Sequence, residues 1–220
     1  KVTIGRARYD LYSESHIGAT FTDREFLDSY SRVAVLDGQF RLGRATRLNF
    51  IAAQSQHRDE AGNERDGPAL GAFLGHTGRN FTASTFFGRT DPDFRTDVGF
   101  VRRVDQQRNF TNIGYRWWPE HWIINWGPTA NYQLNFNHAG IREDEVMGGG
   151  VNFAFARNIS ASVKADQTLE RFGGINFHKT SYNVSASTST NRLFTLRGNF
   201  TAGYEIYFDP ENPYLGRTRQ

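Results

Sequence analysis

Apolar and polar residues alternate along the chain, most regularly in residues 122–136, WIINWGPTANYQLNF. The even positions of this stretch are mainly aromatic or aliphatic, whereas the odd positions are mainly amides, hydroxyls or glycine. Strict alternation predicts a β-strand with two unlike faces. A strand of about fifteen residues would span roughly 50 Å, whereas an ordinary globular strand has about five or six residues. The same two-faced pattern recurs in residues 16–22, 159–170 and 193–208.

Turn-like residues divide the chain at regular intervals. Short turns are predicted at residues 12–15, 43–45, 78–80, 119–121, 156–158 and 189–191. Longer polar connections are predicted at residues 23–31, 57–67, 89–109 and 137–145, with a further short link at Gly173–Gly174. This spacing leaves room for two long strands and one loop between successive short turns. The chain is therefore predicted to hold about twelve strands in up-and-down hairpins, and no helix.

Long two-faced strands joined by alternating short and long connections are typical of a transmembrane β-barrel. In lipid, a closed barrel pairs every backbone N–H and C=O internally. The predicted fold class is therefore all-β, an antiparallel up-and-down transmembrane β-barrel whose apolar face contacts lipid and whose polar face lines the lumen. A soluble antiparallel sandwich or a lipocalin-like barrel also alternates, but its polar face is outside, its strands are shorter and its two turn ends look alike.

Aromatic residues gather near the short turns, where a membrane barrel would meet the lipid headgroups. Three tryptophans flank the turn at residues 119–121. The predicted membrane-interface aromatics are Tyr9, Phe40, Phe81, Trp117, Trp118, Trp122, Phe155 and Phe194. The short turns would then face the periplasm, and the longer loops would face the outside.

Charged and amide residues occupy strand interiors on the polar face. The predicted lumen-lining residues are Arg41, Arg47, Arg116, Asn131, Gln133, Lys164, Asp166, Glu170, Arg197 and Glu205. Two roles remain open for these mixed charges: they can form an ion-pair network that fills the interior, or they can line a path for polar solutes and set its selectivity. The width of such a path depends on the number of strands.

Composition narrows the classes of protein further. The 220 residues include 15% aromatics, which argues against a disordered chain. There is no run of about eighteen apolar residues, so no transmembrane helix is predicted. Cysteine is absent, which weakens a eukaryotic extracellular assignment. A net charge of +3 without a basic block gives little support to nucleic-acid binding. The first residues already read as strand, so any export signal is expected to have been removed or to lie outside this chain.

Two stretches are distinctive enough to compare with a known family. Residues 93–110, DFRTDVGFVRRVDQQRNF, follow the hairpin GRNFTASTFFGRTDP, and residues 7–25 read ARYDLYSESHIGATFTDRE. Both resemble a family of uncharacterised bacterial outer-membrane barrels, in which the matching core is Val98 to Asp105. Arg95-Thr96-Asp97 stand where the family more often has Asn-Pro-Glu. The resemblance covers most of the chain loosely and these two stretches closely.

The resemblance implies a location and an architecture. Full-length members of that family pair an N-terminal domain similar to family-9 carbohydrate-binding modules with a large C-terminal barrel. Residues 1–220 would then be an incomplete barrel domain in the bacterial outer membrane, part of a larger barrel, without the carbohydrate-binding domain. The implied partners are outer-membrane lipid and lipopolysaccharide, missing strands or a partner chain at both sheet edges, and glycans. The function of that family is not established, so the resemblance implies no chemistry.

Catalytic and metal-binding residues are weakly supported. Residues 58–67, 91–97 and 142–145 are rich in carboxylates that could coordinate calcium, but none has the spacing of an EF-hand loop and arginine is interleaved in all three. The histidines form no H-E-x-x-H pattern, and the chain has no G-x-S-x-G elbow of a serine hydrolase. No enzyme activity, metal or other cofactor is therefore predicted.

Two classes of function remain. The favoured one is a non-enzymatic outer-membrane barrel that binds or passes polar solutes, with a link to glycans that rests on the resemblance alone. The alternative is a structural barrel that anchors other envelope proteins, for which a wide loop rich in arginine and aspartate, such as residues 91–108, would be suited. A lipid-cleaving hydrolase is a third and weaker alternative.

Overall fold

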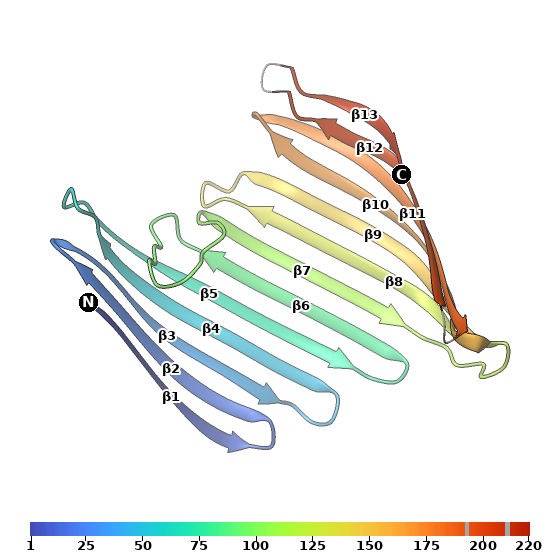
Figure 1. Cartoon of the computed structure of the whole chain (residues 1–220), viewed down its shortest axis with the longest axis horizontal. Helices are drawn as coiled ribbons and strands as arrows, with labels where there is room; N and C mark the ends of the chain where they lie inside the picture. Colours follow the sequence, from blue (N-terminus) through green and yellow to red (C-terminus); the bar gives the residue numbers. More distant parts are fainter. Residues whose placement is uncertain (192–193, 210–211) are drawn as a thin grey trace. The chain divides into compact units, whose positions relative to one another are not determined.

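The computed structural model describes residues 1–191, 194–209 and 212–220. It is all-β, and its thirteen strands follow one another in up-and-down order in one antiparallel sheet (Figure 1). The strands are β1 (Val2–Tyr12), β2 (Ser15–Phe26), β3 (Ser29–Arg41), β4 (Thr46–Arg58), β5 (Glu64–Thr77), β6 (Phe81–Thr90), β7 (Gln106–Tyr115), β8 (Ile123–Phe136), β9 (Arg142–Phe155), β10 (Ile159–Phe172), β11 (Ile175–Asn191), β12 (Phe194–Tyr207) and β13 (Tyr214–Arg219). The sheet is not closed among the described residues, because β1 and β13 form its two edges.

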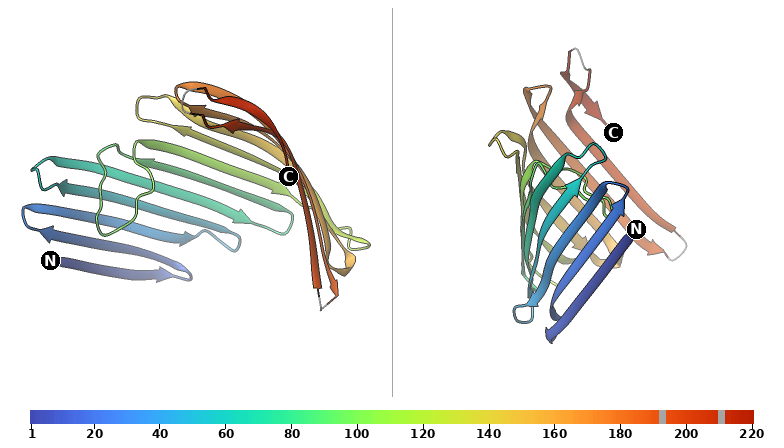
Figure 2. Two further views of the ribbon diagram at one scale, coloured as in Figure 1. Left: turned by 45° about the horizontal axis from the view of Figure 1, so that its top comes forward. Right: turned by 90° about the vertical axis from the view of Figure 1, so that its left-hand side faces the viewer.

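The strands fall into two compact units. The first unit comprises Lys1–His76, Ser84–Asn109 and Asn135–Ile141, and the second comprises Thr77–Ala83, Phe110–Leu134 and Arg142–Gln220. In both units, each strand pairs with the next strand along the chain. Figure 2 shows the long hairpins of the first unit in blue and cyan and those of the second in yellow to red.

Short turns are found near most of the predicted positions. They join β1 to β2, β3 to β4, β5 to β6 and β9 to β10, the last through a 3-10 turn, η1 (Ala156–Asn158). Gly173 and Gly174 join β10 to β11 with φ angles of 56° and 82°. Glycine adopts such left-handed angles without strain, and two-residue hairpin turns require them.

Three of the four long polar connections predicted from the sequence are wrong, because the strands extend into them. β2 continues to Phe26 and β3 begins at Ser29, so residues 23–31 are mostly strand. Their charges pair across the two strands: the Arg32 guanidinium lies 3.1 Å from the Asp23 carboxylate and 2.9 Å from that of Glu25. The connections after β4 and β8 are likewise shorter than predicted, at residues 59–63 and 137–141. Of the four predicted long connections, the one at residues 91–105 remains long.

The described residues form thirteen strands, one more than the approximately twelve predicted. The additional strand is β13, which pairs with β12 from Tyr207 opposite Tyr214 to Ala202 opposite Arg219. The turn predicted at residues 189–191 is misplaced, because β11 runs to Asn191. The residues that follow, 192–193, lie outside the described part of the chain.

Few side chains are buried. In the described part of the chain the buried apolar residues are Val33, Phe94, Leu169, Phe177 and Ile206. A domain of this length ordinarily packs two layers of secondary structure around one core. Here the described elements are strands of one sheet and one short 3-10 turn, so no second layer covers them.

Candidate functional site

One face of the strands in the first unit carries most of its polar side chains. Thr22 pairs with Val33, Val33 with Ser55, and Ser55 with Gly67, so these four positions project from the same face of β2 to β5. We call this face the polar face of the first unit. The alternating register places on the same face Arg6, His16, Asp37, Arg41 and Arg47.

The loop of residues 91–105 lies across this polar face. The Ser31 hydroxyl oxygen accepts a hydrogen bond from the Asp97 amide at 3.1 Å, and the Ser55 hydroxyl oxygen accepts one from the Arg95 amide at 3.1 Å. The Asp91 amide donates to the Pro68 carbonyl at 3.0 Å. Figure 2, left, shows the loop in front of neighbouring strands of the first unit. Groups from β3, β4 and β5 therefore hold the loop backbone in place.

Phe94 anchors the loop by burial. Its side chain is only 6% exposed. The chain can approach this closely because residue 67 is glycine: a Cβ atom there would lie 2.5 Å from the Phe94 nitrogen and 2.9 Å from the Asp93 carbonyl carbon. Any larger side chain at position 67 would push the loop off β5.

A charge cluster lies where the loop meets the strands. The Asp97 carboxylate is 2.7 Å from the Arg24 guanidinium and 3.5 Å from the His57 ring nitrogen Nε2. Arg24 belongs to β2 and His57 to β4, so the Asp97 side chain bridges two strands that are not neighbours. The three groups add an electrostatic attachment to the two serine hydrogen bonds.

The other end of the loop is held by a histidine. The Asp105 carboxylate accepts a hydrogen bond from the backbone amide of His138 at 2.8 Å. The ring nitrogen Nδ1 of His138 lies 3.1 Å from the same carboxylate oxygen. The backbone hydrogen bond from His138 is the main reason that the pKa of Asp105 is lowered. Nε2 of the same ring accepts a hydrogen bond from Arg89 at 3.1 Å. These partners assign the ring proton to Nδ1 in the neutral form of His138.

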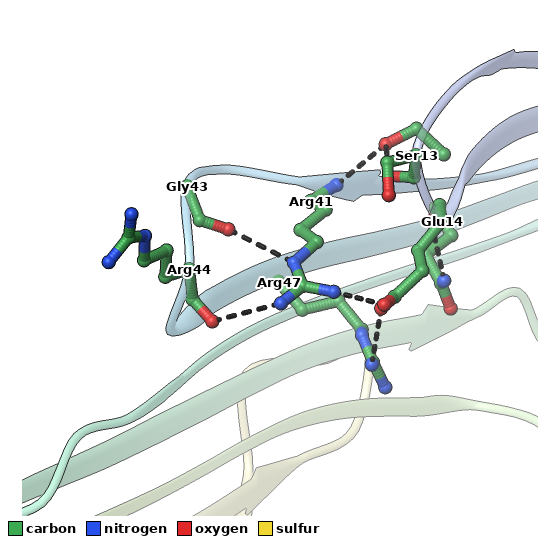
Figure 3. A network of polar contacts seen from close by, with 8 residues as sticks. Ser13, Glu14, Arg41, Gly43, Arg44 and Arg47 are labelled. Carbon is green, nitrogen blue, oxygen red and sulfur yellow. Dashed lines mark hydrogen bonds and ion pairs between the residues drawn. The ribbon is translucent and has the colours of Figure 1, made fainter.

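Arg41 and Arg47 meet at the turn end of the first unit. The Arg41 guanidinium donates to the carbonyl oxygens of Gly43 and Arg44, both at 3.2 Å, and pairs with the Glu14 carboxylate (Figure 3). The Arg47 guanidinium lies 3.5 Å from the same carboxylate. Glu14 therefore links the β1–β2 turn to the β3–β4 turn, and Arg41 orders the second of these turns.

The second unit has its own polar face. The Asp166 carboxylate pairs with Lys164 at 3.0 Å and accepts a weak hydrogen bond from Asn131 at 3.4 Å. Gln133 lines the same hollow as Asn131 and Lys164. Further along, the Lys179 ammonium lies 2.8 Å from the Glu170 carboxylate and 2.9 Å from that of Glu205.

The remaining predicted lumen residues also lie on the polar face of the second unit. Arg197 pairs with Ser187, whose hydroxyl is hydrogen-bonded to that of Ser160 at 2.8 Å. Arg116 lines a small hollow with Asn125 and Gly127. The structure thus joins several predicted residues in ion pairs, while their role in lining a lumen stays a prediction.

Lys179 offers a test of these charge clusters. Its side chain is 15% exposed and neutralises two carboxylates. We expect Lys179→Met to lower the free energy of unfolding by roughly 1–3 kcal/mol, because it leaves Glu170 and Glu205 without their donor. The measurement is a urea unfolding titration. Lys164→Met is the matched control, because Lys164 is 45% exposed, and its loss should cost less than about 1 kcal/mol. Equal costs at both positions would contradict the assignment.

Three of the eight predicted interface aromatics, Trp117, Trp122 and Phe155, form a row in the second unit. Trp117 stacks on Trp126 with ring centroids 4.6 Å apart, and Trp122 contacts Phe155 at 5.7 Å. Phe153 joins the two pairs. Outside this row, Tyr9, Phe81 and Phe194 are exposed, and Phe40 stacks on Phe50.

Trp118 lies apart from this row. Its indole N–H donates to the Arg79 carbonyl at 3.0 Å. The guanidinium carbons of Arg79 and Arg116 lie 5.6 and 5.4 Å from its ring centroid. Two cations over one indole stabilise this ring position, so Trp118 has polar surroundings that its neighbours Trp117 and Trp122 do not share.

Sequence analysis missed the residues that hold the loop. Ser31 falls in the predicted connection at residues 23–31, Ser55 is not among the predicted site residues, and Phe94 falls in the predicted connection at residues 89–109. One signal was present: Ser55 and Gly67 are small residues at polar-face positions, where a backbone can approach.

Comparison with known proteins adds no relative. No family model matches the chain, and neither a curated protein nor a solved structure is significantly similar to it. In the described ranges, no helix is long and apolar enough to cross a membrane. The same residues contain no cluster of three histidine or acidic side chains that could hold a metal ion.

Proposed function

We propose that the chain belongs to a non-enzymatic β-barrel of the bacterial outer membrane, which binds or passes polar solutes along its polar face. The observation that carries the proposal is the uncovered apolar face of the strands. Each unit has such a face, and the register of its paired strands places the apolar residues side by side on it.

In the first unit the apolar face runs across β2 to β5. Leu36 pairs with Ala52, and Ala52 with Leu70. Leu36 is 51% exposed and Leu70 is 47% exposed, as is Phe21 on β2. These are strand-interior positions, and a shallow apolar hollow extends over them.

In the second unit the same arrangement crosses β10, β11 and β12. Val163 pairs with Val184, and Val184 with Phe200. Their exposed fractions are 54%, 46% and 52%. Each lies near the middle of its strand, where a soluble sheet would be covered by a second layer.

Exposed apolar surface on this scale marks a site of contact with another apolar phase. A lipid bilayer supplies such a phase over the whole length of the strands, and strands of about ten residues or more are long enough to cross it. The aromatic row at Trp117, Trp122 and Phe155 lies at the end of the strands with the short turns and fits the lipid headgroup region there.

The two sheet edges support a further part of the proposal. Every residue of β1 is exposed, and β13 pairs only with β12 in the described structure. An unpaired edge leaves N–H and C=O groups in hydrocarbon, at a cost of several kcal/mol for each group. We therefore propose that both edges pair with further strands or with a partner chain. A role in glycan binding is supported by the family resemblance alone.

Reconstitution of residues 1–220 in phospholipid vesicles tests the proposal. We expect the chain to stay with the vesicles after a carbonate wash. Swelling of the vesicles in isosmotic solutions of small neutral sugars is expected only when further strands or a partner chain pair with both sheet edges, as in the full-length protein. Recovery of the folded chain in the aqueous fraction would contradict the membrane location. Retention of the full-length protein without swelling would contradict solute passage and would favour the anchoring alternative.

A further inference from the structure

The polar face of the first unit is interrupted by a patch of apolar residues. Positions that should be polar by alternation are instead Val33 and Val35 on β3, Ile51 and Ala53 on β4, and Phe86 on β6. A face in contact with water alone has no need of these side chains. Their partner is the loop of residues 91–105, which contributes apolar side chains of its own to the same region.

The loop does not fill the space above this patch. Between the loop and strands β3 to β7 lies a cavity of about 530 Å³. Small-molecule sites are typically clefts of about 300–1,000 Å³ with largely apolar walls. Phe100 borders the cavity and yet is 90% exposed. An apolar side chain in that position is available to cover a bound molecule.

A cation lies at the wall of the cavity. The Arg108 guanidinium carbon is 5.4 Å from the centroid of the Phe86 ring, and both residues line the cavity. None of the arginine ion pairs in the described part of the chain involves Arg108, so its charge is available to a ligand. Gln106, next to it on the same face of β7, adds an amide.

We propose that this cavity binds a small molecule with an apolar, aromatic-sized body and one carboxylate, with the body against Val35, Ile51 and Phe86 and the carboxylate at Arg108. The walls are held in place before binding, because Ser31, Ser55 and Phe94 fix the loop on the strands. A fixed site loses less entropy on binding than one that must be ordered. The inference deepens the proposed function, on which it rests, because it names one class of solute for the polar face.

Naphthoate and its neutral analogue naphthamide are suitable probes. Isothermal titration calorimetry of the folded chain should show naphthoate binding about tenfold more tightly than naphthamide, since a hydrogen bond to a charged group adds roughly that factor. Arg108→Gln should remove this difference by weakening naphthoate binding alone. Arg8→Gln is its control, because Arg8 lies on the same polar face, away from the cavity, and pairs with Asp10.

A second pair of variants tests the apolar wall. Ala53→Phe should fill the cavity and abolish binding of both probes, whereas Ala52→Phe, one residue away on the opposite face, should leave binding unchanged. No binding by the unaltered chain, or equal binding by all four variants, would overturn the inference. Binding that depends on Arg108 in a chain that does not enter vesicles would contradict the proposed function alone. Vesicle swelling without naphthoate binding would contradict the inference alone.

Discussion

Arginine in place of Val184 is expected to lower the free energy of unfolding in lipid by roughly 2–4 kcal/mol, the cost of an arginine at the bilayer midplane on the lipid face of a barrel. Val184 is 46% exposed and lies on β11 between Val163 and Phe200 of the adjacent strands. In water the same substitution would replace a half-exposed valine by a solvated cation, and the change would be within about 0.5 kcal/mol. The two environments therefore give different results.

The adjacent residue supplies the control. Asn183 is hydrogen-bonded to Asn199 at 2.7 Å and to Thr201 at 2.9 Å, on the opposite face of β11. Asn183→Arg should lose these hydrogen bonds, but the new guanidinium lies on the polar face, so the free energy of unfolding should fall by only about 1 kcal/mol. Both variants are compared in urea titrations of the chain folded into lipid vesicles. Equal costs for the two substitutions would mean that the apolar face does not contact lipid.

Alanine in place of Phe94 is expected to release the loop of residues 91–105 from the polar face. Removing a buried phenylalanine side chain costs about 3–5 kcal/mol, and Phe94 is the most buried residue of this loop. The backbone amides that would be released are those of Arg95 and Asp97, which in the unaltered protein donate hydrogen bonds to Ser55 and Ser31. Their hydrogen exchange should become at least about a hundredfold faster.

Two further variants make this result specific to docking of the loop. Phe100→Ala removes the same side chain from a residue that is 90% exposed, so exchange at Arg95 and Asp97 should not change. Gly67→Ala leaves the loop sequence intact but puts a Cβ atom 2.5 Å from the Phe94 nitrogen, and it should accelerate exchange as Phe94→Ala does. If Phe100→Ala had the same effect as Phe94→Ala, burial of Phe94 would not be what holds the loop.

Alternation along the sequence was sufficient to predict long antiparallel hairpins, because side-chain period depends only on local backbone geometry. The prediction failed where charged residues of a strand were assigned to a loop. Asp23 and Glu25 were assigned to a loop, but both pair with Arg32 across β2 and β3, and these pairs extend the two strands. Cross-strand pairs of opposite charge stabilise a sheet, and their partners cannot be read from one strand alone.

The candidate site was predicted only in part for the same reason. That Asp166 and Glu205 lie on the polar face follows from the two-residue period of a strand. The ion pair of Glu205 with Lys179 depends on the register between strands. The loop contacts could not be predicted, because Asp97 and Ser31, which are hydrogen-bonded, are separated by 66 positions in the sequence. No local pattern encodes a contact of that separation.

The attachment of the 91–105 loop also determines an order of events in folding. Its backbone is held by Ser31, Ser55 and Pro68, which lie on three different strands. These acceptors come together only after β3, β4 and β5 have paired in register, so the loop has no complete docking surface on any partly assembled hairpin. Local hairpins form early because their loop-closure entropy is small, whereas long-range contacts are established later. Docking of this loop is therefore a late step that reports correct strand register in the first unit.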